Sequence, residues 1–213
     1  MYGTDIIVAR QQTVITMIPS YDQIQTLWDT HNFPQNKQKH CRIVAQTAVW
    51  FARQFVKQNP KLHIDTRLLE AAALVHDIDK MAQKKPYEHH PDAAVRILRE
   101  SSYDEVADLV RTHPLHAILD QSITPKTLEQ KLLYLADKMV KQTIITVDER
   151  FALWRKEHLP EQALIAMNAA YPKVKALEKE ICTAVHVLPR DVARLANKEE
   201  TSTMMLPNKG GTL

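Results

Sequence analysis

The chain has 213 residues, of which 45% are hydrophobic and 25% are charged, and its formal net charge is +3. This composition is typical of one globular domain with a small appendage, and the weak positive charge suits an anionic ligand without requiring nucleic acid. With only two cysteines, a disulfide framework and a cysteine-based zinc site are excluded.

The sequence carries no sign of a membrane or secretory segment. No apolar run approaches the ~20 residues that a membrane-spanning helix needs. The N-terminus has Asp5 before the apolar run Ile6-Ile7-Val8 and lacks the basic segment of a secretory signal. We therefore expect a cytoplasmic protein that does not enter a membrane.

Glycine is the most informative part of the composition. The three glycines are Gly3, Gly210 and Gly211, and none lies between residues 4 and 209. Walker loops and dinucleotide fingerprints are excluded, because both need glycines for tight turns and for close approach of the backbone to phosphate. The sequence therefore predicts an all-α protein in which side chains or a metal hold any phosphate.

The spacing of apolar residues predicts helices along most of the chain. Residues 1–19 form an N-terminal arm, in which 14–18 could be a short strand. The helices expected in the first half cover about 20–31, 34–58, 66–77 and 103–113, with another that begins at Pro91 and a polar loop at 79–86.

The second half of the chain is also predicted to be helical. Thr124 is expected to cap a helix that has Pro125 in its first position and runs to about Lys141. Further helices are expected at about 147–157, 160–184 and 189–197. Residues 200–213 are polar and end in two glycines, so we expect them to be disordered.

Several of the predicted helices carry a metal-compatible side chain on an apolar face. These side chains are His40, His76 with the adjacent Asp77, His113 and Asp137. A single inward histidine is more often a satisfied core residue, but an imidazole beside a carboxylate at a buried helix end is costly unless something compensates it. Their recurrence favours a divalent cation, and the ligand types suit Mn, Fe, Mg, Co, Ni or Zn.

The string AALVHDIDK at residues 72–80 resembles the signature of the HD-domain superfamily of metal-dependent phosphohydrolases. The superfamily's ligand order of His, His-Asp and Asp is met by His40, His76-Asp77 and Asp137. The resemblance implies that these four residues bind one metal. It also implies a single HD-domain helical bundle at residues 20–150, with a C-terminal helical extension at 151–199 packing on it.

Two further segments resemble the insertions of the binuclear members of this superfamily. They are HPDAA, which begins at His90, and RTH, which ends at His113. The resemblance implies that these two histidines hold a second ion with Asp77 as the bridge; the alternative is that they line a polar cleft. The layout is distantly similar to that of the symmetrical diadenosine-tetraphosphate hydrolases, although the stretches after His113 and Lys138 depart from that branch.

The predicted function is hydrolysis of a phosphoester or phosphoanhydride of a small nucleotide-like substrate by a metal-activated hydroxide. Asp77 and Lys80 are the candidate catalytic residues, and Lys80, His116 and Lys138 are the candidate substrate contacts. Cys41 faces away from His40 on its helix, so we expect a core or supporting thiol.

Other functions remain open at this point. The protein could be a phosphodiesterase for cyclic or oligonucleotides, or a non-catalytic HD module that binds a nucleotide and signals. The 6% aromatic content shows no interleaving with basic residues, which argues against nucleic acid as a partner. An apolar face at 164–177 is expected to pack on the core and could instead form a homodimer.

Overall fold

The computed structural model describes the backbone of residues 17–204 and the side chains of residues 17–199. Within these residues the chain forms helices and loops without a β-strand, apart from one isolated antiparallel bridge between Val140 and Ile144. This confirms the all-α prediction. Most of the strand considered at 14–18 lies outside the described residues, as does the segment 205–213.

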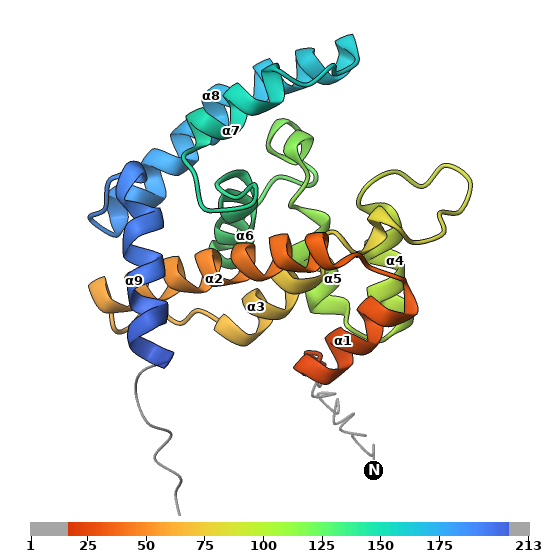
Figure 1. Cartoon of the computed structure of the whole chain (residues 1–213), viewed down its shortest axis with the longest axis horizontal. Helices are drawn as coiled ribbons and strands as arrows, with labels where there is room; N and C mark the ends of the chain where they lie inside the picture. Colours follow the sequence, from red (N-terminus) through yellow and green to blue (C-terminus); the bar gives the residue numbers. More distant parts are fainter. Residues whose placement is uncertain (1–16, 205–213) are drawn as a thin grey trace, which may run out of the picture.

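The described part has nine α-helices and three short 3-10 turns (Figure 1). The helices are α1 (Tyr21–Thr30), α2 (Gln35–Gln58), α3 (Thr66–Val75), α4 (Asp92–Glu100), α5 (Asp104–Arg111), α6 (Leu128–Lys138), α7 (Val147–Arg155), α8 (Glu161–Ala184) and α9 (Val192–Met204). The turns are η1 (Ile78–Lys80), η2 (Leu115–Leu119) and η3 (Pro189–Asp191). None of the described helices combines the length and the apolar character that crossing a membrane requires.

The centre of the molecule is the packing of α2 against α3 and α6 (Figure 1). Alanines make this close packing possible, because Ala48 of α2 and Ala72 and Ala73 of α3 are completely buried and have short side chains. Trp28 ties α1 to the same core through a hydrogen bond from its indole N–H to the carbonyl of Leu74, 3.2 Å long. The arrangement brings the N-terminal part of α2 next to the C-terminal end of α3, where Cys41 Sγ lies 3.7 Å from His76 Nδ1.

Helices α3 and α5 end slightly earlier than expected, and a candidate metal ligand follows each of these ends. Helix α3 ends at Val75 with His76 as its C-cap, and the chain leaves helical geometry at Asp77, which has φ −104° and ψ 11° and is followed by a 3-10 turn. Likewise α5 ends at Arg111, with Thr112 as its C-cap. His76 and His113 therefore stand just past a helix end, one or two residues beyond the helices whose ends the sequence placed at about 77 and 113.

The start of α6 was also predicted wrongly. Its N-cap is Thr127, not Thr124, and it ends at Lys138, not at Lys141. Thr127 accepts a hydrogen bond from the Gln130 N–H, while the Gln130 side chain accepts one from the Thr127 N–H, so that two exposed donors are satisfied together. If Thr124 were the N-cap, the third residue of the helix would be Thr127, which cannot complete a capping box as Gln130 does.

The C-terminal helices lie beside α6, η2 and α2. In Figure 1, α7 and α8 run alongside each other above α6, and α9 crosses near one end of α2. The last helix continues to Met204, beyond its predicted end and into the segment expected to be disordered. Contacts with α2 help to explain this, because Glu199 pairs with Lys57 at 2.7 Å and accepts a hydrogen bond from Gln54 at 2.9 Å.

Candidate metal centre

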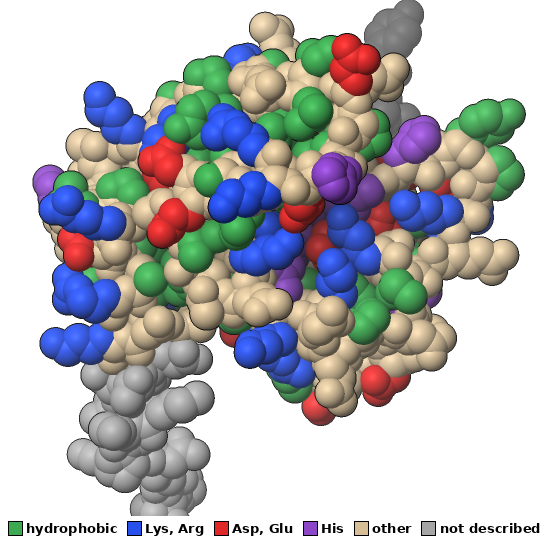
Figure 2. Space-filling view, turned by 45° about the horizontal axis from the view of Figure 1, so that its top comes forward, with side chains coloured by type: hydrophobic (Ala, Val, Ile, Leu, Met, Phe, Trp, Pro, Cys, Tyr) green, Lys and Arg blue, Asp and Glu red, His purple; other side chains and the backbone are tan. Residues whose placement is uncertain are grey.

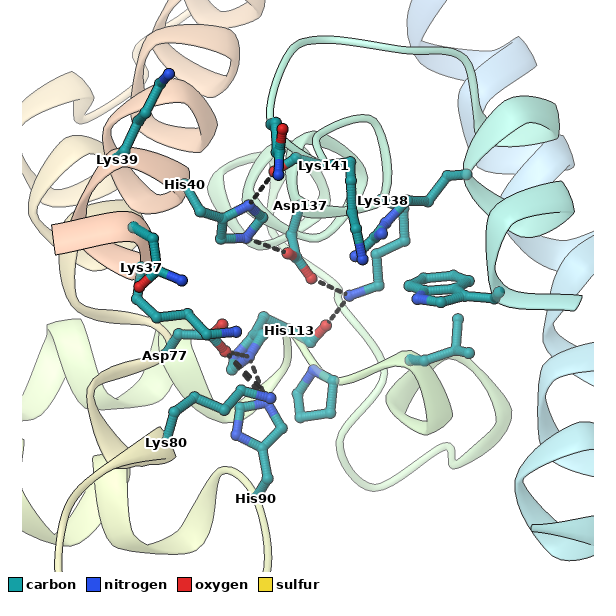
Figure 3. A pocket seen from close by; sticks show the side chains of 16 residues that line it. Lys37, Lys39, His40, Asp77, Lys80, His90, His113, Asp137, Lys138 and Lys141 are labelled. Carbon is teal, nitrogen blue, oxygen red and sulfur yellow. Dashed lines mark hydrogen bonds and ion pairs between the residues drawn. The ribbon is translucent and has the colours of Figure 1, made fainter. Parts of the chain in front are cut away.

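Three of the predicted ligands meet at one carboxylate oxygen. His40 comes from α2 and Asp137 from α6 (Figure 3), and His76 comes from the end of α3. The Nε2 atoms of His40 and His76 lie 3.2 and 3.5 Å from Asp137 Oδ1. These three residues have the spacing of a possible metal site.

Asp77 joins this cluster to a second one. Its Oδ1 lies 3.8 Å from His76 Nε2, 3.7 Å from His90 Nε2 and 3.8 Å from His113 Nε2. His76, Asp77 and His113 form a second group with the spacing of a metal site, and Asp77, Asp79 and His90 form a third. The structure therefore brings all six sequence-predicted metal ligands together, with Asp77 between His76 and the pair of His90 and His113.

The histidine rings are oriented by their other nitrogen, Nδ1. In three rings Nδ1 lies next to a backbone carbonyl oxygen, and in His90 it lies 2.9 Å from Asp79 Oδ1. The carbonyls belong to Lys141 for His40 at 3.2 Å, Ala73 for His76 at 2.8 Å and Val110 for His113 at 2.6 Å. Because these oxygens can only accept, each Nδ1 carries a proton, and a neutral ring then has its lone pair on Nε2.

The positions of His76 and His113 past a helix end explain two of these contacts. The last carbonyls of an α-helix have no partner within the helix. Each of these histidines uses the carbonyl three residues before it, that of Ala73 or Val110, as the acceptor for Nδ1. The helix ends thereby fix the rings with Nε2 facing the cluster.

The donor set fits a divalent cation. His76 Nε2 is a buried atom with no hydrogen-bond partner, and the Nε2 atoms of His90 and His113 are only 2.9 Å apart. Two lone pairs at this distance repel each other unless a cation or a proton lies with them. Imidazole nitrogens combined with carboxylates are ligands that borderline divalent metals accept, and the hydrogen bonds at Nδ1 are those that usually support metal-bound histidines.

Residues 38–141 match the family model of the HD domain. The match supports the resemblance to the HD-domain superfamily and lies within the region 20–150 that the sequence assigned to it. It begins in α2, ends just after α6 and contains all six candidate ligands. HD domains are in general metal-dependent hydrolases, and the residues that converge here all lie in the part of the chain that matches this model. No curated protein and no solved structure matches the chain.

The electrostatics of the candidate metal centre favour a positive charge at this position. Burial disfavours the charged form of His76, but the neighbouring Cys41, Asp77 and Asp137 together outweigh burial and raise its pKa well above the ordinary value. His113 behaves differently, since burial lowers its pKa to about 3 and keeps its ring neutral. A metal ion and a proton thus compete for the nitrogen of His76, whereas the nitrogen of His113 is free of a proton near neutral pH.

Asp79 is a site residue that the sequence analysis missed. The sequence placed it in a polar loop, but it lies in the turn η1 and is completely buried. Both of its carboxylate oxygens contact His90 Nδ1, at 2.9 and 3.1 Å. The alternation in Asp77-Ile78-Asp79 was the available signal, because a buried Ile78 next to two acids is unusual for an exposed loop.

The two candidate lysines have different surroundings. Lys80 lines the cleft with a side chain that is 37% exposed, and its Nζ lies 3.6 Å from Asp77 Oδ1. Lys138 is buried and donates hydrogen bonds to Asp137 Oδ2, at 2.7 Å, and to the backbone carbonyl of His113. Lys138 therefore orients a ligand of each cluster, while Lys80 faces the open side.

His116 is not brought to the site. It is exposed at the turn η2 and does not line the cleft that contains the candidate ligands. Cys41 is buried, with its Sγ 3.7 Å from His76 Nδ1, which agrees with the expected core or supporting thiol. Burial also raises the pKa of this thiol.

Five of the six candidate ligands, all except the completely buried His76, line a cleft of about 700 Å³. Figure 2 shows histidine and acidic side chains in a hollow, with lysine and arginine side chains gathered around it. The two acidic residues of the lining are Asp77 and Asp137, and its basic residues are Lys37, Lys39, Lys80, Lys138, Lys141 and Arg150. The cleft therefore suits an anionic compound of small-molecule size.

Proposed function

We propose that the protein is a metal-dependent phosphohydrolase that cleaves a phosphoester or phosphoanhydride bond of a small nucleotide-like substrate. The observation that carries this proposal is the position of Asp77, whose Oδ1 lies within 3.8 Å of three histidine Nε2 atoms. A carboxylate shared in this way suits a pair of ions. The basic lining of the same cleft suits the negative charge of a phosphate.

Each candidate ligand has a place in this proposal. His40, His76, Asp77 and Asp137 would hold the first divalent ion, and Asp77, His90 and His113 would hold the second. When bound, such ions supply an activated water and positive charge for the phosphoryl oxygens. The identity of the ions stays open among Mn, Fe, Mg, Co, Ni and Zn, since the ligand set suits each of them.

The remaining side chains orient and contact the substrate. Lys80 reaches the open cleft and can contact a phosphoryl oxygen while staying near Asp77. Lys138 fixes the carboxylate of Asp137 and the carbonyl of His113, so its contribution is to hold the ligands in place. Cys41 is not the nucleophile, because a buried thiol with a raised pKa does not form a thiolate near neutral pH.

The size of the cleft favours a small substrate over a polymer. Its volume of about 700 Å³ lies within the ~300–1,000 Å³ that small-molecule sites usually have. A phosphodiesterase for cyclic or oligonucleotides would use the same metal ligands, and a signalling module would bind a nucleotide without cleaving it. A substrate screen separates these functions.

The test uses protein purified without chelator and loaded separately with each candidate metal. Phosphomonoesters, nucleotides, dinucleoside polyphosphates, cyclic dinucleotides and single-stranded oligonucleotides are offered, and products are followed by chromatography. We expect hydrolysis of a small nucleotide-like compound and its loss in Asp77→Asn and His76→Ala. The proposal is wrong if no compound is hydrolysed, or if both variants match the wild type.

Elemental analysis of the same preparations tests the number of ions. Two ions per chain support the assignment of His90 and His113 as ligands. One ion per chain restricts the site to His40, His76, Asp77 and Asp137.

A further inference from the structure

One wall of the cleft comes from outside the HD-domain match. Helix α7 begins at Val147, beyond the last matched residue, 141. Its residues Arg150 and Trp154 nevertheless line the cleft together with the candidate metal ligands. Their role therefore has to be argued from their own contacts.

Arg150 is a cation without a partner. Its Nε and Nη1 atoms are buried and form no hydrogen bond, and no described carboxylate pairs with it. Its guanidinium lies over the ring of Trp154, 4.4 Å from the centroid, which fixes the plane of the group. Since arginine stays charged in proteins, two buried guanidinium nitrogens without hydrogen bonds are unfavourable unless a ligand supplies the acceptors, while the residue as a whole is half-buried and open to the cleft.

The helix that carries Arg150 is held firmly. The first N–H of α7, that of Val147, donates to Oε1 of Glu178 on α8 at 3.1 Å, and Glu178 is buried. The Tyr171 hydroxyl, also on α8, donates to Asp148 Oδ1 at 2.6 Å. Arg150 lies within one turn of these contacts. Its side chain therefore lacks a hydrogen-bond partner at a place where the helix itself is well anchored.

The basic residues around Arg150 indicate the charge of its ligand. Lys37 and Lys39 of α2 line the same cleft, and neither forms an ion pair with a described residue. The two acidic residues of the lining, Asp77 and Asp137, are themselves candidate metal ligands. With those carboxylates engaged by metal, the cleft presents several uncompensated positive charges, more than one phosphate group would neutralise.

We infer that Arg150 binds a second phosphate group of the substrate, so that the site selects compounds with two or more linked phosphates over monophosphates. This inference rests on the proposed function, which places the first phosphate at the metals. The planar guanidinium can donate two parallel hydrogen bonds to phosphate oxygens. Arg150 is thus a specificity-determining residue, with Trp154 as its support.

The test measures binding of two inorganic probes to manganese-loaded protein by titration calorimetry. The probes are orthophosphate and imidodiphosphate, a diphosphate analogue with a P–N–P link, each at the same free Mn²⁺ concentration in cell and syringe. We expect wild type to prefer imidodiphosphate. Loss of a charge-assisted pair should weaken imidodiphosphate binding ~10-fold or more in Arg150→Gln, with less than ~2-fold change for orthophosphate.

Arg155→Gln is the matched control. Arg155 lies on the same helix and also stacks on an aromatic ring, that of Tyr171, but it is exposed and does not line the cleft. We expect this variant to bind both probes as wild type does. The inference is overturned if Arg150→Gln keeps the preference, if it weakens both probes equally, or if wild type shows no preference.

Thermal stability provides a second readout. Because Arg150 forms no hydrogen bond in the described structure, its replacement by glutamine should leave Tm unchanged or raise it. A fall of several degrees would mean that Arg150 supports the fold and would overturn the inference. Arg150→Lys keeps the charge without the planar fork, so we expect it to retain only part of the preference.

These results are separable from the proposed function. If wild type shows the Arg150-dependent preference but hydrolyses no compound, the inference stands and the proposed function fails. If the protein is a phosphohydrolase and Arg150→Gln prefers diphosphate as wild type does, the proposed function stands and the inference is overturned.

Discussion

Replacing Asp79 with asparagine separates the two proposed ion sites. Asp79 touches neither His40 nor Asp137 and contacts His90 through both carboxylate oxygens, at 2.9 and 3.1 Å from Nδ1. Asparagine has the same shape but no charge, so it can accept one hydrogen bond from Nδ1 without enhancing the basicity of Nε2. The second ion should therefore lose affinity while the first keeps it.

The size of the effect follows from the role of Asp79 as a support for His90. Loss of such a support typically weakens metal binding ~10- to 100-fold, which corresponds to about 1.4–2.8 kcal/mol. Complete burial of Asp79 places the expected loss in the upper part of this range, because water cannot replace the missing charge.

The assay is titration of metal-free protein with Mn²⁺, followed by elemental analysis after desalting. Wild type should bind two ions, and Asp79→Asn should retain one after desalting. Asp92→Asn is the control, because Asp92 is exposed and accepts a hydrogen bond from the backbone N–H of His89, not from a ring. The reasoning is refuted if Asp79→Asn binds two ions with wild-type affinity, or if it weakens both ions equally.

Three further predictions concern titration, thiol reactivity and stability. Since Cys41 and the two carboxylates raise the pKa of His76 despite its burial, metal affinity should fall ~10-fold per pH unit below that pKa and level off above it, as measured by Mn²⁺ titration from pH 6 to 9. Burial raises the pKa of Cys182 to about 12 and also raises that of Cys41, so a thiol reagent at pH 8 should modify both only after unfolding; rapid reaction of the native protein would contradict this. Glu178→Ala leaves the buried N–H of Val147 without its acceptor and should lower the free energy of unfolding by ~1–3 kcal/mol in urea, whereas unchanged stability would show that the contact does not hold α7.

The local spacing of apolar residues predicted the positions of most helices but not the residues at which they begin and end. Apolar spacing located α2 and α8 to within a residue or two, because their periodicity continues over many turns. The start of α6 was misplaced because Thr124 and Thr127 are both acceptable N-caps. The choice also involves a contact between α6 and the start of α3, since Glu129 accepts a hydrogen bond from the Asp65 N–H at 3.2 Å. Such a contact is absent from local sequence.

The sequence likewise predicted some residues of the candidate site and missed others. His40, His76, Asp77 and Asp137 could be found because their order and their apolar surroundings form a pattern in the sequence. Asp79 could not be assigned, because its role depends on where the ring of His90 lies after an intervening loop.

Arg150 had no sequence signal at all. It reaches the cleft only because α8 holds α7 in position, through Glu178 and Tyr171. Residues that act through long-range packing of this kind become visible only in the folded structure.

The buried ammonium group of Lys138 bears on whether the chain folds before or after it binds metal. It lies beside Asp137 and the carbonyl of His113 with almost no exposure, so part of the negative charge of the site is balanced by the chain itself. A polypeptide whose acidic ligands depended wholly on metal for neutralisation would resemble a zinc finger, unfolded until the metal arrives. This chain carries an internal counter-charge, so folding can come first and metal uptake can fill a centre that is already shaped.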